Sequence, residues 1–225
     1  TAYIQHLFRP RKVFTMNSTE NGEEAYSDND SYSIDYNASE VAVYAEDEIA
    51  LASWFKANIG LRYDMFSQGD NTYHSFEPRA ALRFQLCPMA SLKMSYTEMS
   101  QPVHLLHSHY LDIPMTSWLP STDRIPPMRS RQAAGGVYMN LPHGIVLNVE
   151  GYWKTMDNMY EYSGIEILYP DIEKWEHDLM RGKGRSYGAE VELAWRTKDT
   201  DISAYYTLSW TERLIKGIWH DWYPA

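Results

Sequence analysis

Residues 185–210, RSYGAEVELAWRTKDTDISAYYTLSW, contain two runs in which every second side chain is apolar. A short polar stretch at 197–200 separates the two runs. A period of two predicts extended strands, because successive side chains of a strand point to opposite faces. Each run has about ten residues, the length that a tilted strand needs to cross a bilayer. The stretch therefore predicts a membrane-spanning β-hairpin, with its apolar face toward lipid and its polar face, which carries Glu190 and Glu192, toward a lumen.

The composition agrees with such strands and argues against several other classes of protein. Aromatic residues make up 14% of the 225 residues, with 18 Tyr and 8 Trp against 6 Phe, a bias typical of membrane-interface girdles and also of carbohydrate-binding surfaces. The sequence has no run of about 18 apolar residues that would predict a transmembrane helix. The net charge of −10 argues against a nucleic-acid-binding protein, and the single cysteine, Cys87, excludes an internal disulfide.

The same alternation recurs along the chain and predicts further strands. These span 1–9, 39–49, 56–67, 76–86, Leu92 to Thr97, 130–141 and 145–156. The acidic segment 15–37 has no periodicity, which predicts a long exposed loop or a disordered segment. Segment 101–129 is a second long connection. Segment 157–183 is a third, in which apolar residues at helical spacing around Trp175 predict a short amphipathic helix.

The connections between the expected strands alternate in length along the chain: long, short, medium, short, long, short, long, short. An up-and-down barrel has tight turns on one rim and long loops on the other, whereas a Greek-key sandwich has no reason for such alternation. The sequence therefore predicts an all-β fold, an antiparallel up-and-down meander that forms part of a transmembrane β-barrel. A soluble sandwich or lipocalin-like barrel, with the apolar face inside, is the alternative. About nine strands is an odd number for a barrel, so residues 1–225 are expected to be a fragment of one β-barrel domain.

Charged residues of both signs crowd the polar face of the expected strands. Opposite charges on neighbouring strands form ladders that a wide polar lumen, or a plug inside it, can hold. The residues expected to face the lumen are Arg62, Asp64, Arg79, Arg83, Lys93, Glu150, Lys154, Glu190 and Glu192.

Several runs of the sequence resemble the barrel of TonB-dependent outer-membrane receptors. They are VAVYAEDEIAL (41–51), ANIGLRYDMF (57–66), FEPRAALRFQL (76–86), ASLKMSYTEMSQPVHLL (90–106), LNVEGYWKTMDNMYEY (147–162), GKGRSYGAEVEL (182–193) and AYYTLSWTER (204–213). Their order resembles most closely the subgroup whose full chains carry an N-terminal carboxypeptidase-regulatory-like domain and a plug. The resemblance implies that this chain supplies about nine strands of a barrel of about 22, without the plug and the N-terminal domain.

The resemblance also implies a transport function in the bacterial outer membrane rather than an enzymatic one. The expected role is that of a segment of an active importer for a scarce nutrient, such as a siderophore, haem, cobalamin, an oligosaccharide or a peptide. The expected partners are outer-membrane lipid, an inner-membrane energy-coupling complex that acts through the plug, and a surface lipoprotein. No cofactor is expected.

Loop side chains are the candidates for ligand binding. Trp118 and Trp175 lie in the two longest later loops, where they either stack on a substrate or pack the loops against each other. His104, His107 and His109 form an H-x-x-H-x-H pattern that could hold a transition metal or haem. Without a fixed carboxylate partner they are expected to be ordinary loop residues, and no metal site is predicted.

A second function, from a different class, is that of a soluble β-rich domain that binds or hydrolyses carbohydrate. Glu190 and Glu192 lie about 7 Å apart on one face of their expected strand, a separation compatible with the carboxylate pair of a glycosidase. Paired acids on a lumen wall opposite lysine and arginine are the commoner arrangement. No catalytic residue is therefore expected.

Overall fold

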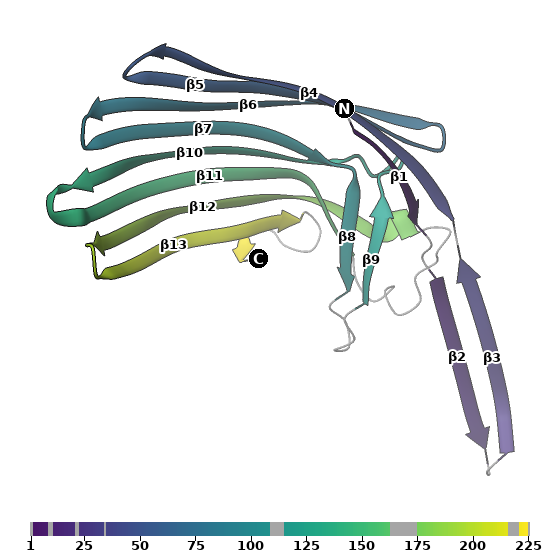
Figure 1. Ribbon diagram of the computed structural model, residues 1–225. Helices are drawn as coiled ribbons and strands as arrows, with labels where there is room; N and C mark the ends of the chain where they lie inside the picture. Colours follow the sequence, from purple (N-terminus) through teal and green to yellow (C-terminus); the bar gives the residue numbers. More distant parts are fainter. Residues whose placement is uncertain are drawn as a thin grey trace.

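The computed structural model describes residues 2–8, 11–20, 23–33, 35–108, 115–162, 175–215 and 221–224. Its main element is a ten-stranded antiparallel sheet with the order β1-β4-β5-β6-β7-β10-β11-β12-β13-β14 (Figure 1). These strands are β1 (Ala2–Phe8), β4 (Tyr36–Ala52), β5 (Phe55–Gln68), β6 (Asn71–Cys87), β7 (Ala90–Gln101), β10 (Met128–Leu141), β11 (Ile145–Tyr162), β12 (Leu179–Arg196), β13 (Asp201–Ile215) and β14 (Tyr223–Pro224). Two separate hairpins pair β2 (Arg11–Glu20) with β3 (Glu23–Ser33), and β8 (Val103–Ser108) with β9 (Met115–Pro120).

Neighbouring strands of the sheet follow one another along the chain once the two hairpins are set aside, which confirms the predicted up-and-down meander. Tight turns join the strands at one end of the sheet (Figure 1, left), at 53–54, 88–89, 142–144 and 197–200. In the third of these turns His143 and Gly144 adopt the left-handed conformation, with φ of 64° and 77°. A Cβ atom at Gly144 would overlap the backbone oxygen of Arg196, so this turn requires glycine.

Two of the connections predicted as loops contain strands instead. Segment 15–37 is wrongly predicted as a loop or a disordered segment, because much of it belongs to the β2–β3 hairpin. One feature of the sequence favours a hairpin in this segment: the dipeptide Asn21-Gly22, common in hairpin turns, stands between the sequences of these two strands. Segment 101–129 likewise contains the β8–β9 hairpin.

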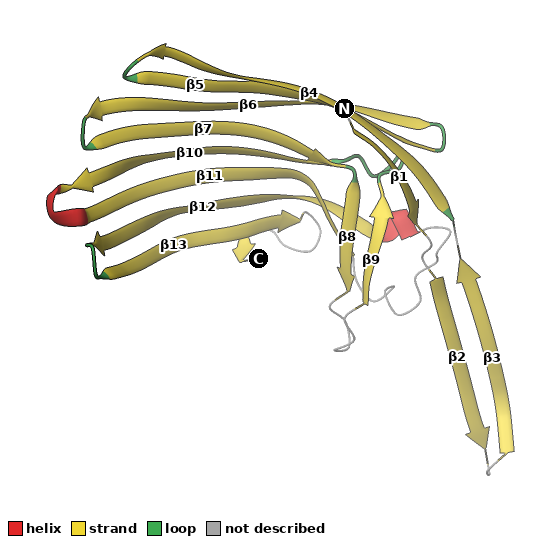
Figure 2. Cartoon of the chain, viewed as in Figure 1, coloured by secondary structure: helices red, strands yellow, loops and turns green. Residues whose placement is uncertain are grey.

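The helix predicted within 157–183 is shorter than expected. Figure 2 shows the described helical elements, which are the 3₁₀ turns η1 (Pro142–Gly144) and η3 (Trp175–Asp178). The strand β12 begins at Leu179, immediately after η3, and leaves no room for further helical turns on that side. Within the described parts of the chain, no helix has the length and apolar character needed to cross a bilayer.

The strand register places apolar and polar side chains on opposite faces of the sheet. We call the face that carries the apolar side chains the aliphatic face. On it Leu193 and Leu208 are 51% and 44% exposed, and Trp210 is 46% exposed. A soluble sandwich would bury such side chains between its two sheets. Among the described residues nothing covers this aliphatic face, which is the opposite of what the soluble alternative requires.

The packed core lies at the end of the sheet opposite the four turns named above, which we call the mouth. The two-residue turn at 69–70, between β5 and β6, also lies at this end, where the sequence predicts a connection of medium length. One buried cluster contains Leu106, Leu119, Ile125 and Trp175, and a second contains Phe8, Ala38 and Phe66. Tyr36 packs against both clusters. The β8–β9 hairpin and η3 are therefore held against the wall of the sheet at the mouth.

Candidate functional site

All nine charged residues that the sequence assigns to a lumen lie on one face of the sheet. Directly opposed pairs on this face are Arg62 with Glu77, Arg83 with Lys93, and Glu150 with Glu190. The other four, Asp64, Arg79, Lys154 and Glu192, follow at even intervals on the same strands. We call this surface the polar face; its exposure to a lumen stays a prediction.

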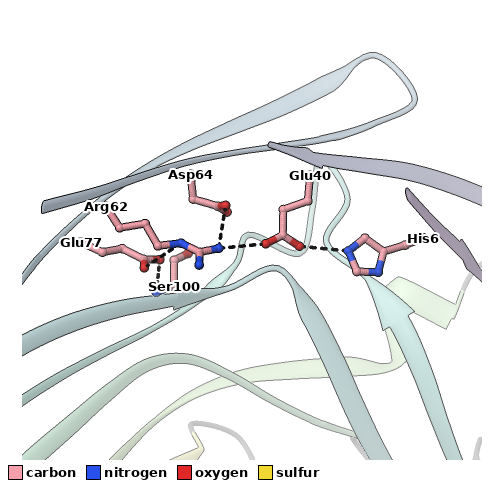
Figure 3. Close-up of polar contacts among 6 residues, drawn as sticks. All are labelled: His6, Glu40, Arg62, Asp64, Glu77 and Ser100. Carbon is pink, nitrogen blue, oxygen red and sulfur yellow. Dashed lines mark hydrogen bonds and ion pairs between the residues drawn. The ribbon is translucent and has the colours of Figure 1, made fainter. Parts of the chain in front are cut away.

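Three carboxylates surround the guanidinium of Arg62 on the polar face near the mouth (Figure 3). The Nη2 atom of Arg62 is 3.2 Å from Glu40 Oε1 and 3.2 Å from Asp64 Oδ1, and its Nε atom is 3.6 Å from Glu77 Oε2. The side chains of Asp64 and Glu77 are only 5% and 7% exposed. Buried carboxylates of like charge are tolerated when a cation and hydrogen bonds compensate them. We call these four residues the Arg62 cluster.

Two further contacts extend the Arg62 cluster to neighbouring strands. The Nε2 atom of His6 lies 2.9 Å from Glu40 Oε2, and the backbone N–H of Ser100 donates a hydrogen bond of 2.8 Å to Glu77 Oε1 (Figure 3). The cluster thereby connects β1, β4, β5, β6 and β7, which are consecutive in the sheet. Its chemistry is that of a structural polar network that fixes the register of this part of the wall.

A hollow of about 450 Å³ opens in the polar face nearer the tight turns. Its lining includes Lys56, Arg83, Lys93, Tyr138 and Glu150. The Nζ atom of Lys93 lies 3.8 Å from the centroid of the Tyr138 ring, a cation–π contact. The hydroxyl of Tyr138 donates a hydrogen bond to Glu150. The hollow is therefore lined by cations and by carboxylates, the latter being Glu48 on β4 and Glu150 on β11.

The two carboxylates considered for glycoside hydrolysis differ in their surroundings. Glu192 accepts hydrogen bonds from Asn148 Nδ2 at 2.7 Å and from the Tyr205 hydroxyl at 3.3 Å, and it lies 3.6 Å from Arg196 Nη2. Glu190 is exposed and is the direct cross-strand neighbour of Glu150. The contacts of Glu192 join β11, β12 and β13, which accounts for this carboxylate without a catalytic role.

His104 is buried at the mouth rather than exposed in a loop. Its side chain is hydrogen-bonded through Nε2 to the hydroxyl of Ser121 at 3.0 Å, and its ring meets Tyr160 edge to face with centroids 5.2 Å apart. Burial lowers the pKa of His104 from 6.5 to about 4. The imidazole is therefore neutral at physiological pH and serves as a packing residue with one polar contact.

The other loop residues considered for ligand binding differ in how exposed they are. Trp175 is 5% exposed and packs the loops together, which is the structural role that the sequence left open beside substrate stacking. Trp118, on β9, is 55% exposed and is available to a ligand. The side chain of His107 and all of His109 lie outside the described residues. Within the described part of the chain, no group of three or more His, Cys, Asp or Glu side chains could hold a metal ion.

The sequence reasoning missed several residues of the polar face. Glu40 and Glu77 in the Arg62 cluster and Tyr138 at the hollow were not singled out, nor was Tyr36 in the mouth. Glu40 continues the alternation of Glu46 and Glu48 back along the same strand, so its face was predictable. Its contact with Arg62 depends on the cross-strand register, which a single sequence does not specify.

The aliphatic face carries an aromatic belt at its mouth end. Trp153, Tyr187 and Trp210 are direct cross-strand neighbours, and their rings stack with centroids 4.9 and 5.4 Å apart. Beyond this belt, toward the mouth, the pairs on the same face become ionic, as between Arg185 and Glu212. Aliphatic, then aromatic, then ionic side chains are the order expected where a strand leaves the hydrocarbon for the head-group region.

Comparison with known proteins agrees with a barrel wall that has one aliphatic face and one polar face. The sequence matches the family described as TonB dependent receptor-like, beta-barrel, over residues 6–221. A search of curated proteins found no match.

Among solved structures, the fold is similar to that of two outer-membrane receptors and of a peptide importer. The ferripyoverdine receptor of the outer membrane of Pseudomonas aeruginosa has 14% identity and a TM-score of 0.58, with 89% of this chain and 27% of that chain covered. The alcaligin outer-membrane receptor FauA from Bordetella pertussis has 17% identity and a TM-score of 0.54, with 99% and 41% covered. The RagAB peptide importer in the open-open state has 16% identity and a TM-score of 0.52, with 88% and 24% covered.

The chain thus spans between about a quarter and two fifths of the length of these structural relatives. It has the same kind of antiparallel barrel wall, although the barrel is not closed within these residues. The family match covers nearly the whole sequence, and the residues it covers include all of the polar face. The chain therefore belongs to the TonB-dependent receptor-like β-barrel family, whose members are receptors of the bacterial outer membrane.

Proposed function

We propose that this chain forms part of the wall of an outer-membrane active importer that binds a scarce nutrient at the cell surface. The observation that carries the proposal is the division of the sheet into an uncovered aliphatic face with an aromatic belt and a polar face that carries charged side chains of both signs. Lipid solvates the first kind of surface and a water-filled or plugged lumen the second.

We further propose that the complete importer has a plug, a preceding carboxypeptidase-regulatory-like domain and a surface lipoprotein partner. The plug would connect the barrel to an inner-membrane energy-coupling complex. The cargo classes remain siderophores, haem, cobalamin, oligosaccharides and peptides. Similarity of fold to a ferripyoverdine receptor and to a peptide importer supports the siderophore and peptide classes within this range. Trp118 is the exposed aromatic residue proposed to contact cargo.

Fluorescence quenching by brominated lipid tests the membrane placement directly. In the full-length receptor, reconstituted into vesicles, one tryptophan is kept in this segment at a time. Brominated acyl chains should quench Trp153 and Trp210 strongly and should leave Trp118, which lies on the mouth hairpin, almost unchanged. Equal quenching of all three, or protection of Trp210, would contradict the proposed orientation.

Uptake measurements test the transport function. Cells that express the full-length receptor should accumulate a labelled siderophore or peptide, and accumulation should stop when the inner-membrane coupling complex is deleted. Binding at the cell surface should persist in that deletion strain, because the mouth is unaffected. Uptake that survives the deletion would contradict active import.

A further inference from the structure

A second hollow, of about 250 Å³, lies at the mouth between the polar face of the sheet and strand β8. We call it the mouth hollow. Pockets that enclose a whole drug-sized molecule measure about 300–1,000 Å³, so the mouth hollow is sized for one group of a larger ligand. The sheet contributes Met128, Met159, Glu161 and Arg213 to its lining, and β8 contributes His104 and Leu105.

The strand register places the sheet residues of the mouth hollow on the polar face. Arg213 lies directly opposite Gly184, which is an even number of residues from Glu190 on β12 and therefore on the same face. A register shift in β11 places Met159 opposite Gly182, and this turns its side chain to the polar face as well. A Cβ atom at Gly184 would lie 2.5 Å from the sulfur atom of Met159. Met159 therefore reaches across β12 toward Arg213.

Arg213 is the cation of this lining, and it has no anionic partner among the described residues. It is half-buried, no ion pair in this part of the chain involves it, and its buried Nε atom lacks a hydrogen-bond partner there. Glu161, the carboxylate of the lining, instead accepts a hydrogen bond of 3.0 Å from the Tyr223 hydroxyl. His104 is neutral, as described above. A guanidinium partly withdrawn from water is stable when an anion or another acceptor compensates it.

The rest of the lining combines an unused hydroxyl with an apolar wall. The Tyr160 hydroxyl is buried and has no hydrogen-bond partner in the described part of the chain. Met128, Met159 and Leu105 supply apolar surface, and methionine adapts to ligands of irregular shape. Leu105 lies directly opposite Trp118, the exposed aromatic residue proposed to contact cargo. Spare hydrogen-bond donors and apolar side chains thus meet beside the exposed part of the hairpin.

We infer that the mouth hollow binds a carboxylate group of the cargo together with the apolar arm next to it. The inference rests on the proposed function and narrows the cargo to molecules with a free carboxylate. The guanidinium of Arg213 donates paired hydrogen bonds to the carboxylate, a geometry that its planar fork favours, and the Tyr160 hydroxyl donates another. The apolar arm lies against Met128, Met159 and Leu105.

A carboxylate suits this lining better than a phosphate or a neutral group. Arg213 and Glu161 together give the lining a net charge near zero. A group with a single negative charge is therefore accommodated beside Arg213, whereas a phosphate dianion would meet Glu161 without a second cation. A neutral sugar would leave the guanidinium without an anion.

Binding of a matched pair of probes to the purified full-length receptor tests the recognition of a carboxylate. N-acetyl-alanyl-leucine carries a carboxylate beside an apolar side chain, and N-acetyl-alanyl-leucinamide has the same shape without the charge. Calorimetric titration should show that the acid binds at least about tenfold more tightly than the amide, because hydrogen bonds to a charged group are stronger. Equal affinities for the two probes would overturn the inference.

Substitutions at the mouth hollow assign that preference to Arg213. Arg213→Gln should bring the ratio of acid to amide affinity close to one, and Tyr160→Phe should lower it roughly two- to tenfold. The ratio is measured within one preparation, so partial unfolding of a variant does not alter it. Lys183→Gln is the matched control, because Lys183 lies opposite Leu214, the neighbour of Arg213, but on the other face, with its side chain 68% exposed. A ratio unchanged in Arg213→Gln, or equally lost in Lys183→Gln, would refute the assignment.

A third probe identifies the source of the carboxylate. The compound 2-hydroxy-4-methylpentanoate keeps the carboxylate and the apolar arm of leucine but has a hydroxyl in place of the amide, as in a hydroxycarboxylate arm of a siderophore. Tighter binding of the acetylated dipeptide supports a peptide terminus, and tighter binding of the hydroxy acid supports such an arm; both should require Arg213. If neither acid binds, the inference fails. A receptor that passes the lipid-quenching test but does not distinguish acid from amide refutes the mouth hollow alone, whereas failure of the quenching test refutes the proposed function.

Discussion

The indole N–H of Trp175 donates a hydrogen bond of 2.8 Å to the hydroxyl of Tyr36, a residue 139 positions earlier in the chain. Their rings also meet edge to face, with centroids 6.4 Å apart. Tyr36 begins β4, and Trp175 precedes β12, so that five strands of the sheet lie between these two elements. The contact therefore spans the mouth and joins two distant parts of the wall.

Removal of the Trp175 ring should loosen the mouth. Trp175→Ala deletes a large buried side chain and should destabilise the mouth by about 3–5 kcal/mol. Trp175→Phe keeps an aromatic ring and loses the hydrogen bond to Tyr36, which should cost about 1 kcal/mol. Amide exchange of β8 and β9 in the full-length receptor measures both effects. Trp118→Ala, at an exposed position on the same hairpin, is the control and should leave exchange unchanged; a larger effect at Trp118 would contradict the packing role of Trp175.

The Arg62 cluster should depend strongly on its single guanidinium. Arg62→Met leaves three neighbouring carboxylates without their cation and should cost about 3–5 kcal/mol, because two of them are buried. Urea unfolding of the receptor in detergent measures the loss. The double variant Arg62→Met, Glu77→Gln should recover part of the stability, since it removes one of the unpaired charges. A double variant less stable than Arg62→Met would show that Glu77 does not depend on Arg62.

Acidification should open the β8–β9 hairpin through His104. Burial lowers the pKa of this imidazole to about 4, below its value of 6.5 in an unfolded chain. The folded state therefore excludes a proton that the open state accepts, and stability is lost as the pH falls from about 6.5 to about 4. The difference between the two pKa values corresponds to a loss of about 3 kcal/mol in the stability of the closed hairpin once the pH is below about 4.

Amide exchange of the β8–β9 hairpin as a function of pH, corrected for intrinsic rates, should show this loss. The variant His104→Gln retains a polar side chain near Ser121 and should flatten the dependence between pH 6.5 and 4. A pH profile identical in the variant and the natural protein would assign the effect to other groups.

Charged substitutions should distinguish the two faces of β13. Leu208→Arg places a guanidinium on the aliphatic face and should destabilise the receptor in lipid by about 2–4 kcal/mol. Thr207→Arg, one residue away on the polar face, should cost much less. Urea titration of both variants in vesicles measures the difference. Equal costs at the two positions would argue against a lipid-facing Leu208.

Much of this architecture is encoded locally in the sequence. Alternation in residues such as Tyr187, Val191 and Leu193 determined the strands and the two faces, because the period of a strand is fixed by backbone geometry. The alternating loop lengths determined the meander. Loop interiors were harder to predict: the β2–β3 hairpin was missed because segment 15–37 has no apolar alternation, although its sequence contains Asn21-Gly22, a dipeptide favoured in hairpin turns.

Cross-strand partners were decided only by the tertiary structure. The sequence placed Arg62 and Glu150 on a polar face, but the register brought Glu40 and Glu77 to Arg62 and placed Arg83 opposite Lys93. The burial of Trp175 and His104 was likewise invisible, since it depends on segments distant in the chain meeting at the mouth. A strand's own sequence fixes which way its side chains point. Which side chains meet depends on how neighbouring strands are aligned and on how far the sheet curls, and both are properties of the whole wall.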